Sequence, residues 1–121
     1  MVTKILIADD EPAIRHMLRR AFESLSWKVW EAEDGEQALS MALLERFDLM
    51  ISDYAMPKLN GKSLLDRYRA RFPKLPFIIT SGSFRDSVQR LEGVFFLRKP
   101  FRLEHLREMI QRILPSCSVG T

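Results

Sequence analysis

Polar and charged side chains follow short apolar runs at four places in the chain. They are Asp9, Asp10, Glu11, Asp53, Ser81 and Lys99. Carboxylates that lie close together raise the cost of ionising one another, and a hard divalent cation, Mg²⁺ or Mn²⁺, is the usual means of holding them ionised. A carboxylate can also attack phosphorus, while a metal, a lysine and a hydroxyl share the charge on the transferring group. The residue types therefore predict metal-assisted phosphoryl transfer, provided that the fold gathers them.

Five short runs of apolar residues predict the β-strands that must position these groups. The predicted strands are Lys4–Ala8, Lys28–Ala32, Leu49–Ser52, Phe77–Thr80 and Val94–Leu97. Four of the runs are almost entirely apolar, which is typical of parallel strands covered on both faces. The run at 28–32 alternates between polar and apolar residues, so we expect that strand nearer an edge of the sheet.

Longer stretches with helical spacing lie between the strands and predict helices. The first helix opens at Pro12, where the missing N–H costs nothing, and the second covers about residues 36–46 after a capping Asp34 with Gln37 three residues on. We expect the first helix to bury one face: Ile14, Met17, Leu18, Ala21, Phe22 and Leu25. The second is expected to bury Ala38, Leu39, Ala42 and Leu43.

Two further helices are expected in the second half of the chain. One covers about residues 62–72 and stops at Pro73, and the other covers about 103–114 and stops before Pro115. The apolar pattern is weak at 83–91, so a short or irregular helix is the most that segment predicts.

Strands that alternate with helices predict an α/β fold with a doubly wound, five-stranded parallel sheet. The carboxyl ends of such strands meet at one edge, which is where sites form. The polar residues above all follow strands, so we expect them to converge. We predict a single domain over residues 1–115 and a disordered tail at 116–121, with no repeat or linker.

Composition excludes several other classes of protein. The chain has 121 residues, of which 46% are hydrophobic and 29% are charged, as in ordinary globular domains. Its one cysteine, Cys117, permits no intrachain disulfide, and no apolar stretch predicts a signal peptide or a membrane span, so we expect a cytoplasmic protein. The net charge of +3 comes from scattered basic residues, which favours a solvated basic face over a nucleic-acid site.

Four segments in order, ILIADDEP, LMISDYAMPKLNG, PFIITSG and FLRKPF, resemble the signature of the receiver domains of two-component response regulators, the CheY-like (βα)5 flavodoxin-like fold. The resemblance covers residues 3–114. It implies that the chain is a signalling domain and not an enzyme. Such a domain assists its own phosphorylation and dephosphorylation. A histidine kinase or histidine phosphotransfer protein would donate the phosphoryl group, and a downstream protein would read the result. A monomer or weak dimer is expected, without direct contact to nucleic acid or membrane.

The same resemblance implies a role for each matching residue. Asp53 is expected to accept the phosphoryl group, and the Mg²⁺ or Mn²⁺ ligands would be Asp9, Asp10, Asp53 and the backbone carbonyl of Ala55. Lys99 would pair with the phosphoryl group, and its bond to Pro100 is expected to be cis. Ser81 resembles the switch hydroxyl, and Phe96 stands where an aromatic side chain turns inward when that hydroxyl moves.

The chain also departs from the family pattern. The stretch from Ser81 to Lys99 is about one helical turn short, which puts the usual output surface in doubt. Small side chains at Ala55 and Ser83 cannot orient an attacking water, so we expect slow loss of phosphate. Each residue has an ordinary alternative: the acids at 9–11 could cap a helix, Ser81 could be a turn residue and Lys99 a surface charge.

Two alternatives for the function remain, and two further classes of protein are disfavoured. The chain could be a receiver-like interaction module that is not phosphorylated, or a receiver fragment of a hybrid histidine kinase. An aspartyl-phosphate hydrolase would need a second acid where Ala55 stands. A flavin-binding electron carrier would need a glycine-rich phosphate loop where ADDEP stands.

Overall fold

The computed structural model describes residues 2–82 and 91–115, which form one five-stranded parallel sheet in the order β2-β1-β3-β4-β5. The strands are β1 (Lys4–Ala8), β2 (Lys28–Ala32), β3 (Leu49–Asp53), β4 (Phe77–Ser81) and β5 (Val94–Arg98). The last three strands extend one residue beyond their predicted ends, because pairs such as Asp53 with Thr80 continue the ladder. The predictions for 83–90 and for the tail lie outside the described residues.

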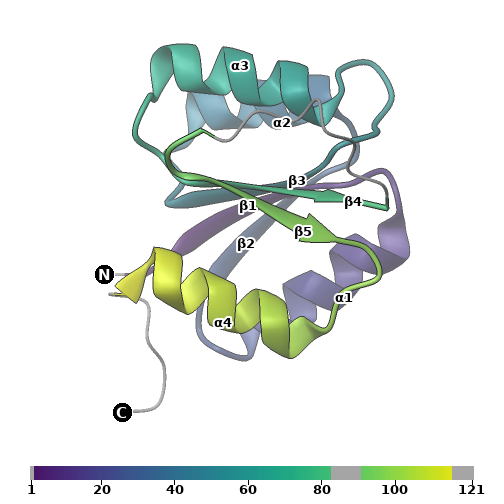
Figure 1. Ribbon diagram of the computed structural model, residues 1–121, viewed down its shortest axis with the longest axis vertical. Coiled ribbons are helices and arrows are strands. Elements are labelled where there is room, and N and C mark those ends of the chain that lie inside the picture. Colours follow the sequence, from purple (N-terminus) through teal and green to yellow (C-terminus); the bar gives the residue numbers. More distant parts are fainter. Residues whose placement is uncertain (1, 83–90, 116–121) are drawn as a thin grey trace.

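Helices cover both faces of the sheet (Figure 1). They are α1 (Pro12–Glu23), α2 (Gly35–Leu44), α3 (Gly61–Arg71) and α4 (Leu103–Ile113). The pair α2 and α3 lies on one face, and α1 and α4 lie on the other (Figure 1). This arrangement confirms the doubly wound fold, with helix ends within two residues of those predicted. None of the described helices combines the length and apolar character needed to cross a bilayer.

Local sequence explains where the helices begin. Pro12 occupies the first turn of α1, as predicted. At α2, Asp34 Oδ1 accepts a hydrogen bond of 2.8 Å from the Gln37 amide, while Gln37 Oε1 accepts one of 2.7 Å from the amide of Glu33. Asn60 caps α3 in the same way, with Oδ1 accepting from the Ser63 amide at 2.9 Å.

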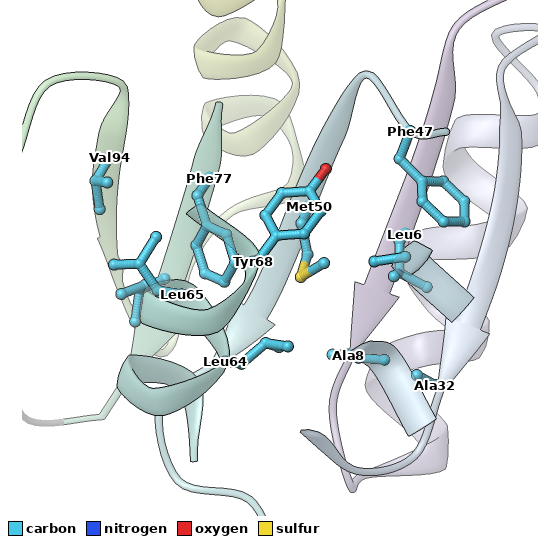
Figure 2. Close-up of a cluster of buried hydrophobic side chains, with 13 residues drawn as sticks. Leu6, Ala8, Ala32, Phe47, Met50, Leu64, Leu65, Tyr68, Phe77 and Val94 are labelled. Carbon is cyan, nitrogen blue, oxygen red and sulfur yellow. The ribbon is translucent and has the colours of Figure 1, made fainter. Parts of the chain in front are cut away.

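The core consists of two clusters, one on each face of the sheet. Side chains alternate along β1, so that Ile5 and Ile7 pack toward α1 and α4 while Leu6 and Ala8 pack toward α2 and α3. Figure 2 shows the second cluster, in which Tyr68 of α3 lies beside Phe77. The two clusters hold the sheet rigidly from both sides, which fixes the positions of the strand ends.

Three predictions of burial need correction. Met17 and Leu43 were expected on buried faces but are 42% and 45% exposed, because the buried stripes of α1 and α2 are narrower than the apolar pattern suggests. The apolar β5 was expected to be covered on both faces, yet it is an edge strand and Phe95 is 36% exposed. The alternating β2 forms the opposite edge, as predicted.

Candidate functional site

Parallel pairing brings the carboxyl ends of β1, β3, β4 and β5 to one edge of the sheet. Ala8 pairs with Ser52, and Ser81 pairs with Arg98, so the residues that follow these positions emerge side by side. The backbone amide of Lys99 donates to the carbonyl oxygen of Ser81 at 2.7 Å, which ties the chain after β5 to the end of β4. The predicted convergence of the polar residues is therefore observed.

Three aspartates meet at this edge. Asp9, Asp10 and Asp53 each offer one carboxylate oxygen, and these oxygens all lie within 4.8 Å of one another. Asp9 and Asp53 are buried, whereas Asp10 is exposed. Asp9 Oδ1 accepts a hydrogen bond of 2.9 Å from the Glu11 amide, which orients its other oxygen into the cluster. The acids do more than cap α1, since Glu11 at its N-cap makes no side-chain capping bond.

The ammonium group of Lys99 joins the buried aspartates. Its Nζ lies 3.0 Å from Asp9 Oδ2, 3.2 Å from Asp53 Oδ2 and 3.6 Å from Glu11 Oε1. The Lys99 side chain is 17% exposed, which excludes the alternative of an ordinary surface charge. Burial disfavours the charged form of Lys99 and acts to lower its pKa. The hydrogen bond to Asp9 and the negative charges of Asp9 and Asp53 outweigh burial, so the pKa of Lys99 is raised.

The carboxyl group of Asp53 lies in a poorly solvated position. Burial is the main reason why the pKa of Asp53 is raised above its ordinary value. The positive charge of Lys99 acts in the opposite direction, while the charges of Asp9 and Asp10 add to the increase. The positive charge of Lys99 is therefore not enough to offset the burial of the Asp53 carboxylate and its repulsion by Asp9 and Asp10.

A divalent cation suits this donor set. Among the described residues, the ammonium group of Lys99 contacts the carboxylates of Asp9, Asp53 and Glu11, and Asp10 adds a fourth carboxylate to the cluster, so negative charge is in excess. Oxygen ligands on opposite sides of Mg²⁺ lie about 4.2 Å apart. The observed limit of 4.8 Å exceeds that length by little, so small side-chain rotations or bridging waters would bring the acids into range. The hard oxygen donors fit Mg²⁺ or Mn²⁺.

The other predicted residues lie around the acids. Ser81 is buried at the end of β4, and Phe96 is partly covered within β5, where it packs against the α2 and α3 side. Ala55 lies two residues after Asp53 in the exposed connection to α3. The bond between Lys99 and Pro100 is cis, as expected. The roles of Ser81, Phe96 and Ala55 stay predictions.

Two contributors were missed in the sequence. Glu11 was noted as an acid, but its contact with Lys99 was not expected. Gly61, the first residue of α3, lies against the backbone of Asp53: a β-carbon there would be 2.5 Å from the Asp53 carbonyl oxygen. Its amide also donates to the Tyr54 carbonyl at 2.7 Å. A glycine after the capping Asn60 was the available signal for this close approach.

Comparisons with known proteins agree with this geometry. The family model described as response regulator receiver domain matches residues 5–111. The chain is 33% identical over 130 aligned residues to "Response regulator MprA" of Mycolicibacterium vanbaalenii, covering 99% of this chain and 55% of that protein. It is 34% identical to the protein of the same name in Mycobacterium tuberculosis, covering 94% of this chain and 51% of that protein. The chain thus spans about half the length of these curated relatives.

Solved structures share the fold. The chemotaxis response regulator CheY4 of Vibrio cholerae superposes with a TM-score of 0.86 at 28% identity, covering 94% of this chain and all of that one. The receiver domain from the hybrid histidine kinase CckA superposes with a TM-score of 0.81 at 34% identity, covering 92% and 98%. With the matched family model and the acidic cluster at the strand ends, these similarities show that the chain belongs to the response regulator receiver domain family of two-component signalling.

Proposed function

We propose that this chain accepts a phosphoryl group on Asp53 from a phosphohistidine, in a reaction that depends on Mg²⁺ or Mn²⁺. The observation that carries the proposal is the buried Asp53 carboxylate, 3.2 Å from Lys99 Nζ and within 4.8 Å of carboxylate oxygens of Asp9 and Asp10. The proposed nucleophile, the ammonium group of Lys99 and carboxylate oxygens suited to a hard metal ion therefore lie together. The receiver unit is assigned to residues 1–115.

In the proposed reaction a carboxylate oxygen of Asp53 attacks phosphorus in line with the bond to the histidine nitrogen of the donor. An O–P bond forms and the P–N bond breaks, and the electron pair returns to the imidazole ring, which takes up a proton. Lys99 stabilises the negative charge on the phosphoryl oxygens. The bound cation, held by Asp9, Asp10, Asp53 and the Ala55 carbonyl, would neutralise further oxygen charge.

The product carries more negative charge than the carboxylate it replaces. Lys99, which is shared among Asp9, Asp53 and Glu11, would shift toward the new group. The Ser81 hydroxyl would follow and Phe96 would repack, so that a partner-binding surface near β4 and β5 changes. The donor would be a histidine kinase or a phosphotransfer protein, and the reader a protein or domain of unknown identity.

Phosphorylation is tested by intact-mass spectrometry after incubation with Mg²⁺ and acetyl phosphate as a small phosphodonor. The wild-type chain is expected to gain one phosphoryl mass, and the gain is expected to vanish in Asp53→Asn or when EDTA removes the metal. Asp66→Asn is the matched control, because Asp66 is an exposed acid that, among the described residues, pairs only with Lys62 on the surface of α3.

Two outcomes would contradict the proposal. One is a folded wild-type chain that gains no mass at saturating Mg²⁺, which would favour an interaction module that is not phosphorylated. The other is a mass gain that persists in Asp53→Asn, which would place the acceptor elsewhere.

A further inference from the structure

One arginine ties the backbone of the acidic pair to the second strand. Arg15 lies in the first turns of α1, and its Nη1 donates to the carbonyl oxygen of Asp9 at 2.6 Å. Its Nε donates to Glu31 Oε1 at 3.2 Å. The two side chains are only 11% and 15% exposed, so this contact is largely shielded from water. Arg15 therefore bridges helix α1, strand β2 and the loop after β1.

The carbonyl that Arg15 binds belongs to the peptide between Asp9 and Asp10. The amide of Asp9 is already fixed, because it donates to the carbonyl of Ala32 at 3.1 Å. Since the peptide group is planar, holding the Asp9 carbonyl sets the orientation of the plane from which Asp10 departs. Within the described part of the chain, no hydrogen bond or ion pair holds the exposed Asp10 side chain, so its direction depends on that backbone.

A second arginine, Arg19, also pairs with the Glu31 carboxylate and can be compared with Arg15. Arg19 Nη1 donates to the other Glu31 oxygen at 3.0 Å, and its Nε donates to Glu23 at 3.3 Å. The Arg19 side chain is 44% exposed and lies one turn further along α1. Both arginines pair with Glu31, yet of the two only Arg15 makes a described hydrogen bond to the backbone of the site. Arg19 is therefore a matched control for the contact that Arg15 makes with the Asp9 carbonyl.

We propose that Arg15, held by Glu31, is a positioning residue that fixes the peptide between Asp9 and Asp10 and so directs the Asp10 carboxylate toward the cation site. This inference rests on the proposed function, because it requires that the acids bind a divalent cation. Partners that orient metal ligands typically contribute 10- to 100-fold to metal affinity, and we expect a value of about tenfold here.

The first measurement is calorimetric titration of the full chain with Mg²⁺. Arg15→Ala is expected to bind Mg²⁺ about tenfold more weakly than wild type. Arg19→Ala is expected to stay within about twofold, as for surface substitutions away from the site. Arg15→Lys keeps the charge but lacks the planar fork that reaches both Glu31 and the Asp9 carbonyl, so it is expected to restore less than half of the lost binding free energy.

A second measurement separates positioning from general stability. The rate of phosphorylation by acetyl phosphate is recorded against Mg²⁺ concentration. Arg15→Ala is expected to reach the wild-type rate at saturating Mg²⁺ while needing about tenfold more Mg²⁺ for half of that rate. In the metal-free protein, the Asp10 amide signal in ¹⁵N NMR should move, because it reports the hydrogen bond on the preceding carbonyl. The local change shows that the bond to the Asp9 carbonyl is lost, and a role in stability alone does not predict the concentration shift.

The outcomes distinguish this inference from the proposed function. A wild-type chain that binds no Mg²⁺ defeats both. A wild-type chain that binds Mg²⁺, together with an Arg15→Ala variant of equal affinity or an Arg19→Ala variant with the same loss, overturns the positioning role alone. If Arg15→Ala does not fold, Glu31→Gln replaces it in the titration. A weaker Mg²⁺ affinity then supports the role, and an unchanged one overturns it.

Discussion

Gly61 provides the sharpest test of how the backbone supports Asp53. A β-carbon at this position would lie 2.5 Å from the Asp53 carbonyl oxygen and 2.9 Å from the Tyr54 α-carbon. Close carbon–oxygen contacts in proteins lie at about 3.3–3.6 Å, so Gly61→Ala requires that α3 and the end of β3 separate by about 1 Å. Overpacking of this kind costs about 1–3 kcal/mol. The better helix propensity of alanine offsets part of that cost, by at most about 1 kcal/mol.

We therefore expect Gly61→Ala to lower the free energy of unfolding by about 1–2 kcal/mol, measured by urea denaturation. Since Asp53 is the proposed nucleophile, a displacement of about 1 Å should also slow phosphorylation by about 100-fold. Gly82→Ala is the matched control, because among the described residues nothing lies within 4 Å of a β-carbon at that position. Its stability should change by no more than about 0.5 kcal/mol.

Equal stability and equal phosphorylation rates in Gly61→Ala and wild type would refute this reasoning. So would equal losses in Gly61→Ala and Gly82→Ala, since the steric argument applies to the first position alone.

The structure makes three further predictions. Tyr68→Phe should stabilise the protein by about 1 kcal/mol, because the buried Tyr68 hydroxyl has no hydrogen-bond partner in the described part of the chain. Burial also raises the pKa of Tyr68 to about 12, so the stability that comes from keeping its hydroxyl protonated is present below pH 10 and is lost between pH 10 and 12. Tyr68→Phe should therefore flatten that part of the pH profile of urea denaturation. A profile identical to wild type would contradict this prediction. Mg²⁺ at a hundred times its dissociation constant should stabilise the chain by about 2.7 kcal/mol, and this gain should disappear in Asp10→Asn; a thermal shift that persists in the variant would remove Asp10 from the metal site. In the absence of metal, burial raises the pKa of Asp53, so ¹³C NMR should show its carboxyl group titrating above the ordinary range of aspartate, and a lower midpoint would show that Lys99 outweighs burial. A raised pKa means that the stabilising contribution of neutral Asp53 is lost as pH rises through that value, so Asp53→Asn should raise the melting temperature at neutral pH in EDTA.

Much of the fold followed from local signals that act within a few residues. Pro12 marks the start of α1, because proline has no backbone N–H that would lack a partner in the first turn. Asp34 and Gln37 mark the start of α2, because the Asp34 side chain accepts a hydrogen bond from the Gln37 backbone N–H. The exposure of Met17 and Leu43 could not be predicted in this way, since helical periodicity defines an apolar stripe but not how far the neighbouring elements cover it.

The site shows the same division between local and long-range information. The convergence of Asp9, Asp53 and Lys99 followed from the rule that the ends of parallel strands meet at one edge. The contact between Lys99 and Glu11, and the bridge that Arg15 makes to Asp9 and Glu31, join residues whose distances depend on rotamers and on strand register. Sequence spacing carries no information about those geometries, so the three-dimensional structure was needed to find them.

The most direct test of the central claim locates the phosphoryl group on the chain. After incubation with Mg²⁺ and acetyl phosphate, borohydride reduction converts an aspartyl phosphate to homoserine, and digestion with trypsin places Asp53 and Asp48 in the same peptide, residues 47–58. Peptide sequencing by mass spectrometry is expected to find homoserine at position 53 with Asp48 unchanged. Homoserine at position 48, or an unmodified peptide from a folded chain that binds Mg²⁺, would contradict the proposal that Asp53 is the acceptor.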